Sequence, residues 1–184
     1  GSLQMIYIID HKDSFTQNVV HQFSNFGNVE CDNFDKINQK KLDQSKVIVF
    51  SPGPGSPKDY PMSSKIYKKY KGKKKIIGIC LGFQQILYSE KGKIIEQKKI
   101  YHGYQSKVRV ISNYSLFKKN RIFKVGRYHS LKLKEPFYSK NFEITMRCAI
   151  SNVAMAIENN KDKIYGFQFH PESFLTENGN LLIK

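Results

Sequence analysis

The sequence predicts an α/β protein with a mostly parallel open sheet, helices on both faces of that sheet, and a small antiparallel layer. Three observations support this fold class. Four short apolar runs alternate with helical patterns in the first half of the chain. These runs are nearly continuous, as in strands buried on both faces. From about residue 94 the pattern changes to short, often alternating segments, which are typical of antiparallel strands.

The first half is read in chain order as strand and helix in alternation. The apolar runs at residues 5–10, 29–33, 47–50 and 76–79 are the expected strands. A loop, DHKDSFTQN, follows the first strand and leads into a helix, with Asp13 or Ser14 as its expected N-cap and Gly27 as its stop. Further helices are expected over residues 39–44 and 62–70, and one begins at residues 83–87. Right-handed crossovers should bring the ends of these strands to one edge of the sheet, where ligands bind.

The second half contains six short segments that are expected to be strands. They span residues 107–111, 121–125, 131–133, 143–147, 153–157 and 164–169. No internal repeat or linker separates them from the first half, so we expect one domain over residues 5–184. Residues 1–4, GSLQ, precede Met5 and resemble a remnant of an expression vector.

Composition and charge narrow the class of protein. The chain has 184 residues and a formal net charge of +16, but only four of its basic residues are arginines and the lysines are scattered. Arginine dominates the recognition of phosphates and bases, so we expect no nucleic-acid partner and interpret the charge as a solvated surface or a docking surface for an acidic partner. No apolar run approaches the roughly 20 residues that span a membrane. Three cysteines without paired spacing indicate a reducing, cytoplasmic location and no metal site.

The segment GICLGFQ carries the strongest chemical signal. Cys80 lies between an expected buried strand and the helix that follows, so the first N–H groups of that helix point toward its sulfur. We therefore expect a nucleophile elbow with sulfur in place of a hydroxyl, and an environment that favours thiolate over thiol.

Two further motifs supply possible partners for this nucleophile. An expected strand ends at His170, and Glu172 follows it in HPES, so the histidine could act as general base and the glutamate could orient it. The rigid loop SPGPGSP, at residues 51–57, could hold a backbone N–H in an oxyanion hole. Taken alone, an HPES motif is more often a surface turn, and a loop such as SPGPGSP is more often a rigid connection between elements. Together with Cys80 they form a Cys-His-Glu arrangement for acyl transfer.

The chain resembles the class I, triad-type glutamine amidotransferases. The motifs that carry the resemblance run from end to end: IIDHKDSFTQN, FSPGPGSP, GICLGFQ, HGY at residues 102–104, VGRYHSL at 125–131 and GFQFHPESFLTENG at 166–179. Within the family they are most similar to the amidotransferase subunits of chorismate-utilising enzymes. The resemblance implies a flavodoxin-like α/β fold of the class I amidotransferase type.

The resemblance also implies a role for individual residues. Cys80 would attack the carboxamide of glutamine to form a thioester, His170 would move the protons and Glu172 would orient His170. The oxyanion hole would be formed by the backbone N–H groups of Gly53 and Leu81. The residues implied in glutamine binding are Gly53, Pro54, Gly55, Gln84, Ser130 and Leu131.

The implied function is the glutaminase half-reaction, with ammonia passed through a channel to a separate synthase subunit. That partner would be anthranilate synthase component I, in tryptophan biosynthesis, or aminodeoxychorismate (para-aminobenzoate) synthase component I, in folate biosynthesis. No cofactor is expected on this chain, and the Mg²⁺ that family members use would be on the partner. Two other possibilities stay open: a cysteine hydrolase of the same fold that acts on γ-glutamyl or peptide bonds, and a non-catalytic basic binding module.

The chain also departs from the family pattern in places. Phe83 replaces a frequent histidine beside the nucleophile. Tyr104 and residues 158–160 replace basic residues, and residues 88–91 stand where a pair of glycines is usual. We expect these last three changes at a partner surface. Of the other histidines, His11, His21 and His102 are expected at the surface or behind the site, and His129 near the site.

Overall fold

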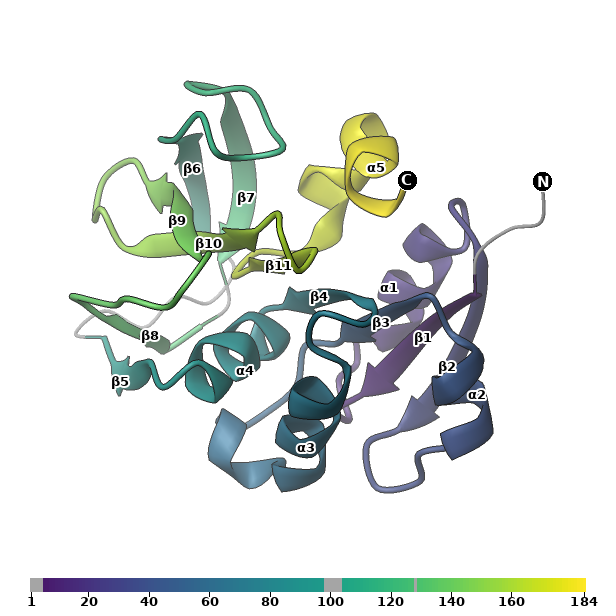
Figure 1. Ribbon diagram of the computed structural model, residues 1–184. Helices are drawn as coiled ribbons and strands as arrows, with labels where there is room; N and C mark the ends of the chain where they lie inside the picture. The colour runs from purple at the N-terminus through teal and green to yellow at the C-terminus, as the bar shows by residue number, and fades with distance from the viewer. Residues whose placement is uncertain (1–4, 98–103, 128) are drawn as a thin grey trace.

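The computed structural model describes residues 5–97, 104–127 and 129–184, and its strands form two sheets (Figure 1). A nine-stranded sheet has the order β2-β1-β3-β4-β11-β10-β9-β6-β7, and β5 pairs with β8 in a two-stranded sheet. The strands are β1 (Met5–Asp10), β2 (Asn28–Asn33), β3 (Val47–Phe50), β4 (Lys75–Ile79), β5 (Lys93–Glu96), β6 (Tyr104–Val110), β7 (Ile122–Arg127), β8 (Leu131–Lys134), β9 (Glu143–Cys148), β10 (Ala154–Asn159) and β11 (Ile164–Phe167). The helices are α1 (Thr16–Phe23), α2 (Gln39–Gln44), α3 (Pro61–Tyr70), α4 (Leu81–Ser89) and α5 (Leu175–Ile183), with short 3-10 turns η1 (Pro57–Asp59) and η2 (Pro171–Ser173).

The expected α/β fold is confirmed, and five neighbouring strands of the large sheet are parallel. β1 pairs in parallel with β2 and β3, β3 with β4, and β4 with β11. The order 2-1-3-4 followed by one late strand is that of flavodoxin-like sheets, which bind ligands outside the carboxyl ends of their strands. Because β11 comes from the last quarter of the chain yet pairs with β4, the segments that follow these two strands meet at the same edge.

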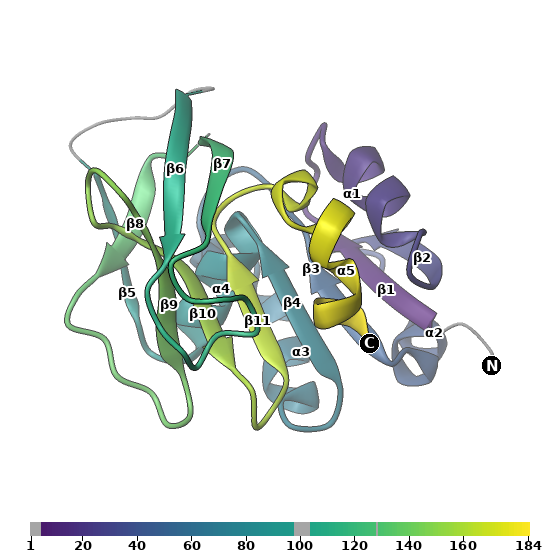
Figure 2. The same ribbon diagram turned by 90° about the horizontal axis from the view of Figure 1, so that it is seen from above.

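Helices cover both faces of the parallel strands, and two views of the ribbon show the two layers (Figures 1 and 2). The alternation of β1 explains the division: Ile6 and Ile8 face the core under α1 and α5, while Tyr7 and Ile9 face the core under α2, α3 and α4. All four side chains are fully buried. None of the helices described has the length and apolar character needed to cross a bilayer.

The remaining strands of the large sheet, β10, β9, β6 and β7, are antiparallel. Four elements were not expected from the sequence: β5, α5 and the two 3-10 turns. The expected strand at residues 164–169 ends at Phe167. The expected N-cap of α1 is also wrong, because Phe15 occupies that position and Asp13 instead accepts a 2.7 Å hydrogen bond from the backbone N–H of Phe15.

The expectation of a partner surface at residues 158–160 is wrong for its first two residues. Glu158 and Asn159 are fully buried. The Glu158 carboxylate accepts hydrogen bonds from Ser115 Oγ at 2.6 Å, from Leu116 N at 2.9 Å and from Thr145 Oγ1. This carboxylate therefore joins the 112–117 segment to β9 and β10. The motif residues His102 and Gly103 lie outside the described residues, as does Tyr128 in the RYHSL motif.

Candidate active site

Cys80 occupies a strained turn between β4 and α4. Its backbone has φ 53° and ψ −104°, a positive-φ conformation that residues other than glycine rarely adopt. The Cys80 N–H donates to Phe167 O at 2.8 Å, and the Cys80 thiol donates to Gln168 O at 2.8 Å. Phe167 ends β11 and Gln168 follows it, so the parallel pairing of β4 with β11 sets the direction of the sulfur.

Gly82 allows this turn to pack against the neighbouring strand. A Cβ atom at residue 82 would lie 2.0 Å from Phe50 O, far inside van der Waals contact. Only glycine therefore lets the first turn of α4 approach the end of β3 so closely. The close approach also brings Cys80 beside the loop that follows β3.

Cys80 lines a polar cavity of about 190 Å³. Eight residues named from the sequence surround it: Gly53, Pro54, Gly55, Cys80, Leu81, Gln84, Ser130 and Leu131. His129 and Gln168 complete the lining. The volume is below the roughly 300–1,000 Å³ of pockets for drug-sized ligands, so the cavity suits a molecule the size of one amino acid.

Hydrogen bonds hold the two loops that form the walls of this cavity. In the 51–57 loop, Tyr60 OH donates to Pro54 O at 2.7 Å. In the 129–131 loop, Gln97 donates through its backbone to Ser130 O at 2.9 Å and through Nε2 to His129 O at 3.0 Å. These hydrogen bonds fix the backbone of both cavity walls.

His170 and Glu172 follow β11 at the same edge of the sheet, outside the lining of the cavity. His170 is buried, and the Phe15 ring packs edge-on against it with ring centroids 4.9 Å apart. Burial lowers the pKa of His170, although the charges of Glu172 and Asp13 oppose the shift. The imidazole is therefore neutral at neutral pH and able to accept a proton. Glu172 is exposed and accepts a hydrogen bond of 3.4 Å from Gln22 Nε2.

The expected preference of Cys80 for the thiolate form is not supported by its surroundings. Burial raises the pKa of Cys80 well above its usual range, and the negative charges of Asp13 and Glu172 raise it further. Cys80 is thus a thiol at neutral pH and needs a base before it can act as a nucleophile.

Three residues beside the site were missed from the sequence. Asp13 and Phe15 reach it from the loop after β1, as their effects on Cys80 and His170 show. Gln168 lines the cavity and accepts the hydrogen bond of the thiol through its backbone oxygen. DSFT and GFQFHPES were motifs of the resemblance, but which of their side chains point at the nucleophile depends on the pairing of distant strands.

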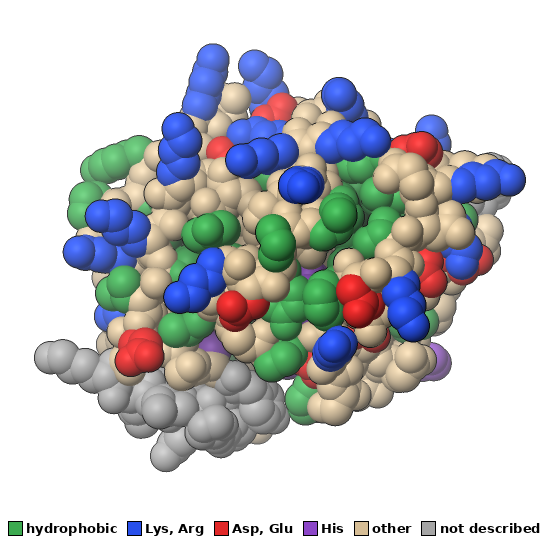
Figure 3. All heavy atoms as spheres, turned by 90° about the horizontal axis from the view of Figure 1, so that it is seen from below, with side chains coloured by type: hydrophobic (Ala, Val, Ile, Leu, Met, Phe, Trp, Pro, Cys, Tyr) green, Lys and Arg blue, Asp and Glu red, His purple; other side chains and the backbone are tan. Residues whose placement is uncertain are grey.

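Two shallow grooves lie beside the mouth of the cavity. One of about 590 Å³ shares Leu131 with the cavity lining and includes the neighbouring Ser56, and one of about 450 Å³ lies along α3. Seen from below, the molecule shows basic side chains, Lys or Arg, beside a patch of apolar side chains that is interspersed with acidic ones (Figure 3). The lysines that line the two grooves are Lys58, Lys65, Lys68, Lys91 and Lys93.

Comparison with known proteins shows what the whole chain is similar to. The family model described as "Glutamine amidotransferase class-I" matches residues 7–184. The chain is 39% identical over 184 residues to a protein of Lactococcus lactis subsp. lactis named "Anthranilate synthase component 2", with 98% of this chain and 92% of that protein covered. A Helicobacter pylori protein of the same name is 36% identical over 199 residues, with 97% and 94% covered.

A solved structure shares the fold. The glutamine amidotransferase of Thermotoga maritima superposes with a TM-score of 0.74 at 14% sequence identity, covering 95% of this chain and 78% of that chain. The match of the family model over nearly the whole chain, with the relatives just described, decides the family. This chain belongs to the class I glutamine amidotransferases.

Proposed function

We propose that this chain is the glutaminase subunit of an anthranilate synthase, which hydrolyses L-glutamine at Cys80 and passes ammonia to a separate synthase subunit. The observation that carries the proposal is the Cys80 thiol at a positive-φ elbow, lining a cavity the size of one amino acid. The names of the relatives from L. lactis and H. pylori favour anthranilate synthesis as the pathway.

The first half of the reaction forms a covalent intermediate. His170, which is neutral because burial lowers its pKa, takes the proton of the Cys80 thiol, and the new thiolate attacks the carboxamide carbon of glutamine. The oxyanion is held by the backbone N–H groups of Leu81 and Gly53. Leu81 is the first residue of α4, where N–H groups have no partner within the helix. Losing one such donor typically costs about 10²–10³ in kcat.

The second half releases the products. The protonated His170 gives its proton to the departing nitrogen, so ammonia leaves and a γ-glutamyl thioester remains on Cys80. Water, deprotonated by the same imidazole, then attacks the thioester, and glutamate leaves as the thiol is restored. Glu172 stabilises the imidazolium in both halves, because its negative charge favours the protonated form of His170.

The proposal divides the synthesis between two subunits. The partner is a chorismate-utilising synthase, and it, not this chain, holds the Mg²⁺. The amidotransferase chain itself carries no cofactor and is cytoplasmic. Ammonia that escapes into water becomes protonated and unreactive, so the partner covers the cavity and receives ammonia directly.

The test is to replace Cys80 by serine in the complex with anthranilate synthase component I. Glutamine-dependent synthesis should fall by more than 10³-fold, because a hydroxyl is a far weaker nucleophile, while synthesis from added ammonium salt should persist. Cys31→Ser is the matched control, since Cys31 is half-buried on β2, away from the cavity lining, and this change should leave both activities intact.

The alternatives give different results in the same assay. Product formation only with aminodeoxychorismate synthase component I would assign the chain to folate biosynthesis. Loss of both activities in Cys80→Ser would contradict the division of labour. Faster turnover of γ-glutamyl peptides than of glutamine would identify a hydrolase, although the small cavity argues against a peptide substrate.

A further inference from the structure

One polar group in the cavity lining lacks a partner. Gln168 is 3% exposed, and its other polar atoms are all engaged. Its N–H donates to Met155 O at 2.9 Å, its backbone oxygen accepts from the Cys80 thiol, and its Oε1 accepts from Gln84 Nε2 at 3.1 Å. The side-chain Nε2 is buried without a hydrogen bond.

A buried donor without a partner is costly, so its persistence calls for an explanation. Among the described residues that have a buried, unpaired side-chain atom, Gln168 is the one that lines the cavity. The hydrogen bond from Gln84 Nε2 to Gln168 Oε1 disfavours a 180° flip of the Gln168 side-chain amide. The terminal torsion of glutamine is broad, so a small rotation presents Nε2 to a ligand oxygen while Oε1 keeps its bond.

We propose that Gln168 is a specificity-determining residue whose side-chain N–H₂ binds the α-carboxylate of the substrate glutamine. The inference rests on the proposed function, since it takes L-glutamine as the substrate. An unpaired N–H donor favours a ligand that carries a hydrogen-bond acceptor. Glutamine has two such acceptor groups, the carboxamide oxygen and the α-carboxylate. The carboxamide oxygen is assigned to the N–H groups of Leu81 and Gly53.

The position of Gln168 fits the second acceptor. Its amide is anchored to Gln84, one helical turn beyond Cys80, and a turn of helix rises about 5.4 Å. This separation matches a substrate whose carboxamide lies at the sulfur and whose α-carbon lies further along α4. The hydrogen-bonded amides of Gln84 and Gln168 thus favour a substrate with a free α-carboxylate at the end of the cavity away from the sulfur.

The test compares two substrates, L-glutamine and its α-amide, L-glutaminamide, at pH 7.5 in the complex with the synthase subunit. The wild-type chain should prefer glutamine in kcat/KM. In Gln168→Glu, a carboxylate faces the α-carboxylate, so KM for glutamine should rise roughly 10-fold to 100-fold while kcat changes less than about 3-fold. Glutaminamide can donate to the new carboxylate, so the ratio of kcat/KM for glutamine over glutaminamide should fall at least 10-fold.

Gln85→Glu is the matched control. Gln85 is a buried glutamine on the same helix, one of its amide atoms is also unpaired, and its Nε2 donates to Ser64 Oγ outside the cavity. This variant should lose stability without changing the ratio between the two substrates. Gln168→Met, which removes the donor without adding charge, keeps the test informative if Gln168→Glu fails to fold, and it should also reduce the ratio.

The outcomes separate this inference from the proposed function. A ratio in Gln168→Glu and Gln168→Met that stays within twofold of the wild-type value, in chains that turn over glutamine, would overturn the role of Gln168 and leave the glutaminase assignment standing. A wild-type complex that turns over no glutamine would instead overturn the proposed function, and the role of Gln168 with it.

Discussion

His11 shows at the scale of one residue how a side chain outside the cavity shapes it. The sequence interpretation put His11 at the surface or behind the site, and the structure buries it completely. Its Nδ1 donates to Ser51 O at 3.1 Å, and its Nε2 accepts from Ser63 Oγ at 2.8 Å. A Cβ atom at Gly53 would lie 2.4 Å from the Cβ of His11, so His11 packs directly against the 51–57 loop.

The burial of His11 predicts a pH dependence of stability. Burial lowers its pKa to about 4, whereas the unfolded chain binds a proton near pH 6.5. Stability is therefore complete above pH 6.5 and falls as pH drops toward 4, by roughly 3 kcal/mol in the free energy of unfolding. Urea unfolding at pH 7.5 and pH 5 should show this slope, and His11→Asn should flatten it.

The control for this experiment is His21→Asn. His21 is exposed on α1, so its replacement should leave the slope between pH 7.5 and pH 5 unchanged. Equal slopes in His11→Asn and the wild-type chain would contradict the assignment of the pH dependence to His11.

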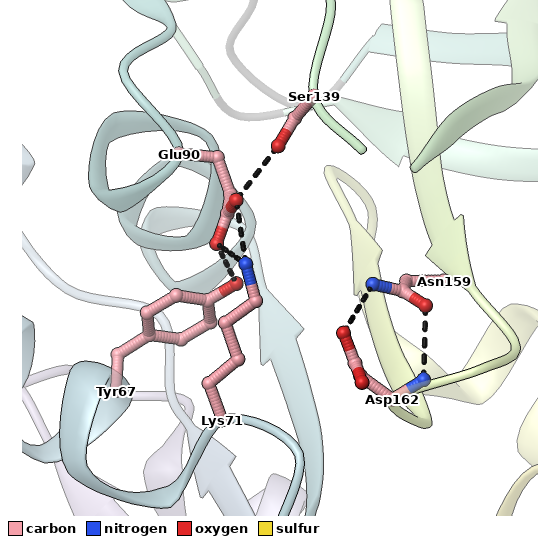
Figure 4. A network of polar contacts seen from close by, with 6 residues as sticks. All are labelled: Tyr67, Lys71, Glu90, Ser139, Asn159 and Asp162. Carbon is pink, nitrogen blue, oxygen red and sulfur yellow. Dashed lines mark hydrogen bonds and ion pairs between the residues drawn. The ribbon is translucent and has the colours of Figure 1, made fainter. Parts of the chain in front are cut away.

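At the scale of elements, one carboxylate joins three segments behind the site (Figure 4). Glu90, at the end of α4, accepts hydrogen bonds from Tyr67 OH of α3 at 2.6 Å and from Ser139 Oγ at 2.7 Å, and pairs with Lys71 Nζ at 2.8 Å. Burial alone would raise the pKa of Glu90, but these hydrogen bonds outweigh burial and lower it. The network holds α4, which carries Cys80 at its start, against α3.

Glu90→Gln should weaken the packing of α4 against α3, because the neutral amide forms no ion pair with Lys71 and accepts fewer hydrogen bonds. We expect a loss of roughly 2 kcal/mol, or a fall in Tm of about 4–8 °C, measured by thermal unfolding at pH 7.5. Glu96→Gln, an exposed change on β5, is the control and should stay within 1 °C of the wild type. Equal Tm values for the two variants would show that the network adds nothing.

At the scale of the whole molecule, lysines line two separate groups of surface hollows. The mouth cluster consists of Lys58, Lys65, Lys68, Lys91 and Lys93 and lines the grooves beside the catalytic cavity. The far cluster lies at the amino ends of β4 and β11, around a cavity of about 330 Å³, and consists of Lys46, Lys73, Lys74, Lys75, Lys161, Lys163 and Lys184. Of the two clusters, only the mouth cluster has members, Lys58 and Lys93, on a groove that shares Leu131 with the Cys80 cavity.

This placement predicts which lysines contribute to docking of the synthase subunit. The triple variant Lys58→Glu, Lys91→Glu, Lys93→Glu should weaken the complex at least 10-fold and reduce the salt dependence of association, because charges at the mouth steer an acidic partner surface. The triple variant Lys46→Glu, Lys73→Glu, Lys161→Glu makes the same change in net charge in the far cluster. Titration calorimetry at two salt concentrations compares them, and equal losses in affinity would contradict docking at the mouth.

Local pattern was enough to predict much of the fold. The strands at residues 5–10 and 47–50, the helix at 39–44 and the Cys80 turn were placed correctly, because each depends on a run of neighbouring residues. Helix α5 was missed because Asn178, Gly179 and Asn180 are poor helix formers and the helix depends on packing against α1. Strand β5 was missed because four residues carry too little periodicity.

The sequence by itself determined the α/β class, the family and the residue types gathered around the cavity, since these are written in short motifs and their order. Only the tertiary structure decided that β11 lies beside β4, that the Cys80 thiol is protonated, and that Gln168 Nε2 faces no partner. The physical reason is that strand order, desolvation and hydrogen-bond satisfaction depend on which distant segments meet, and no local pattern carries that information.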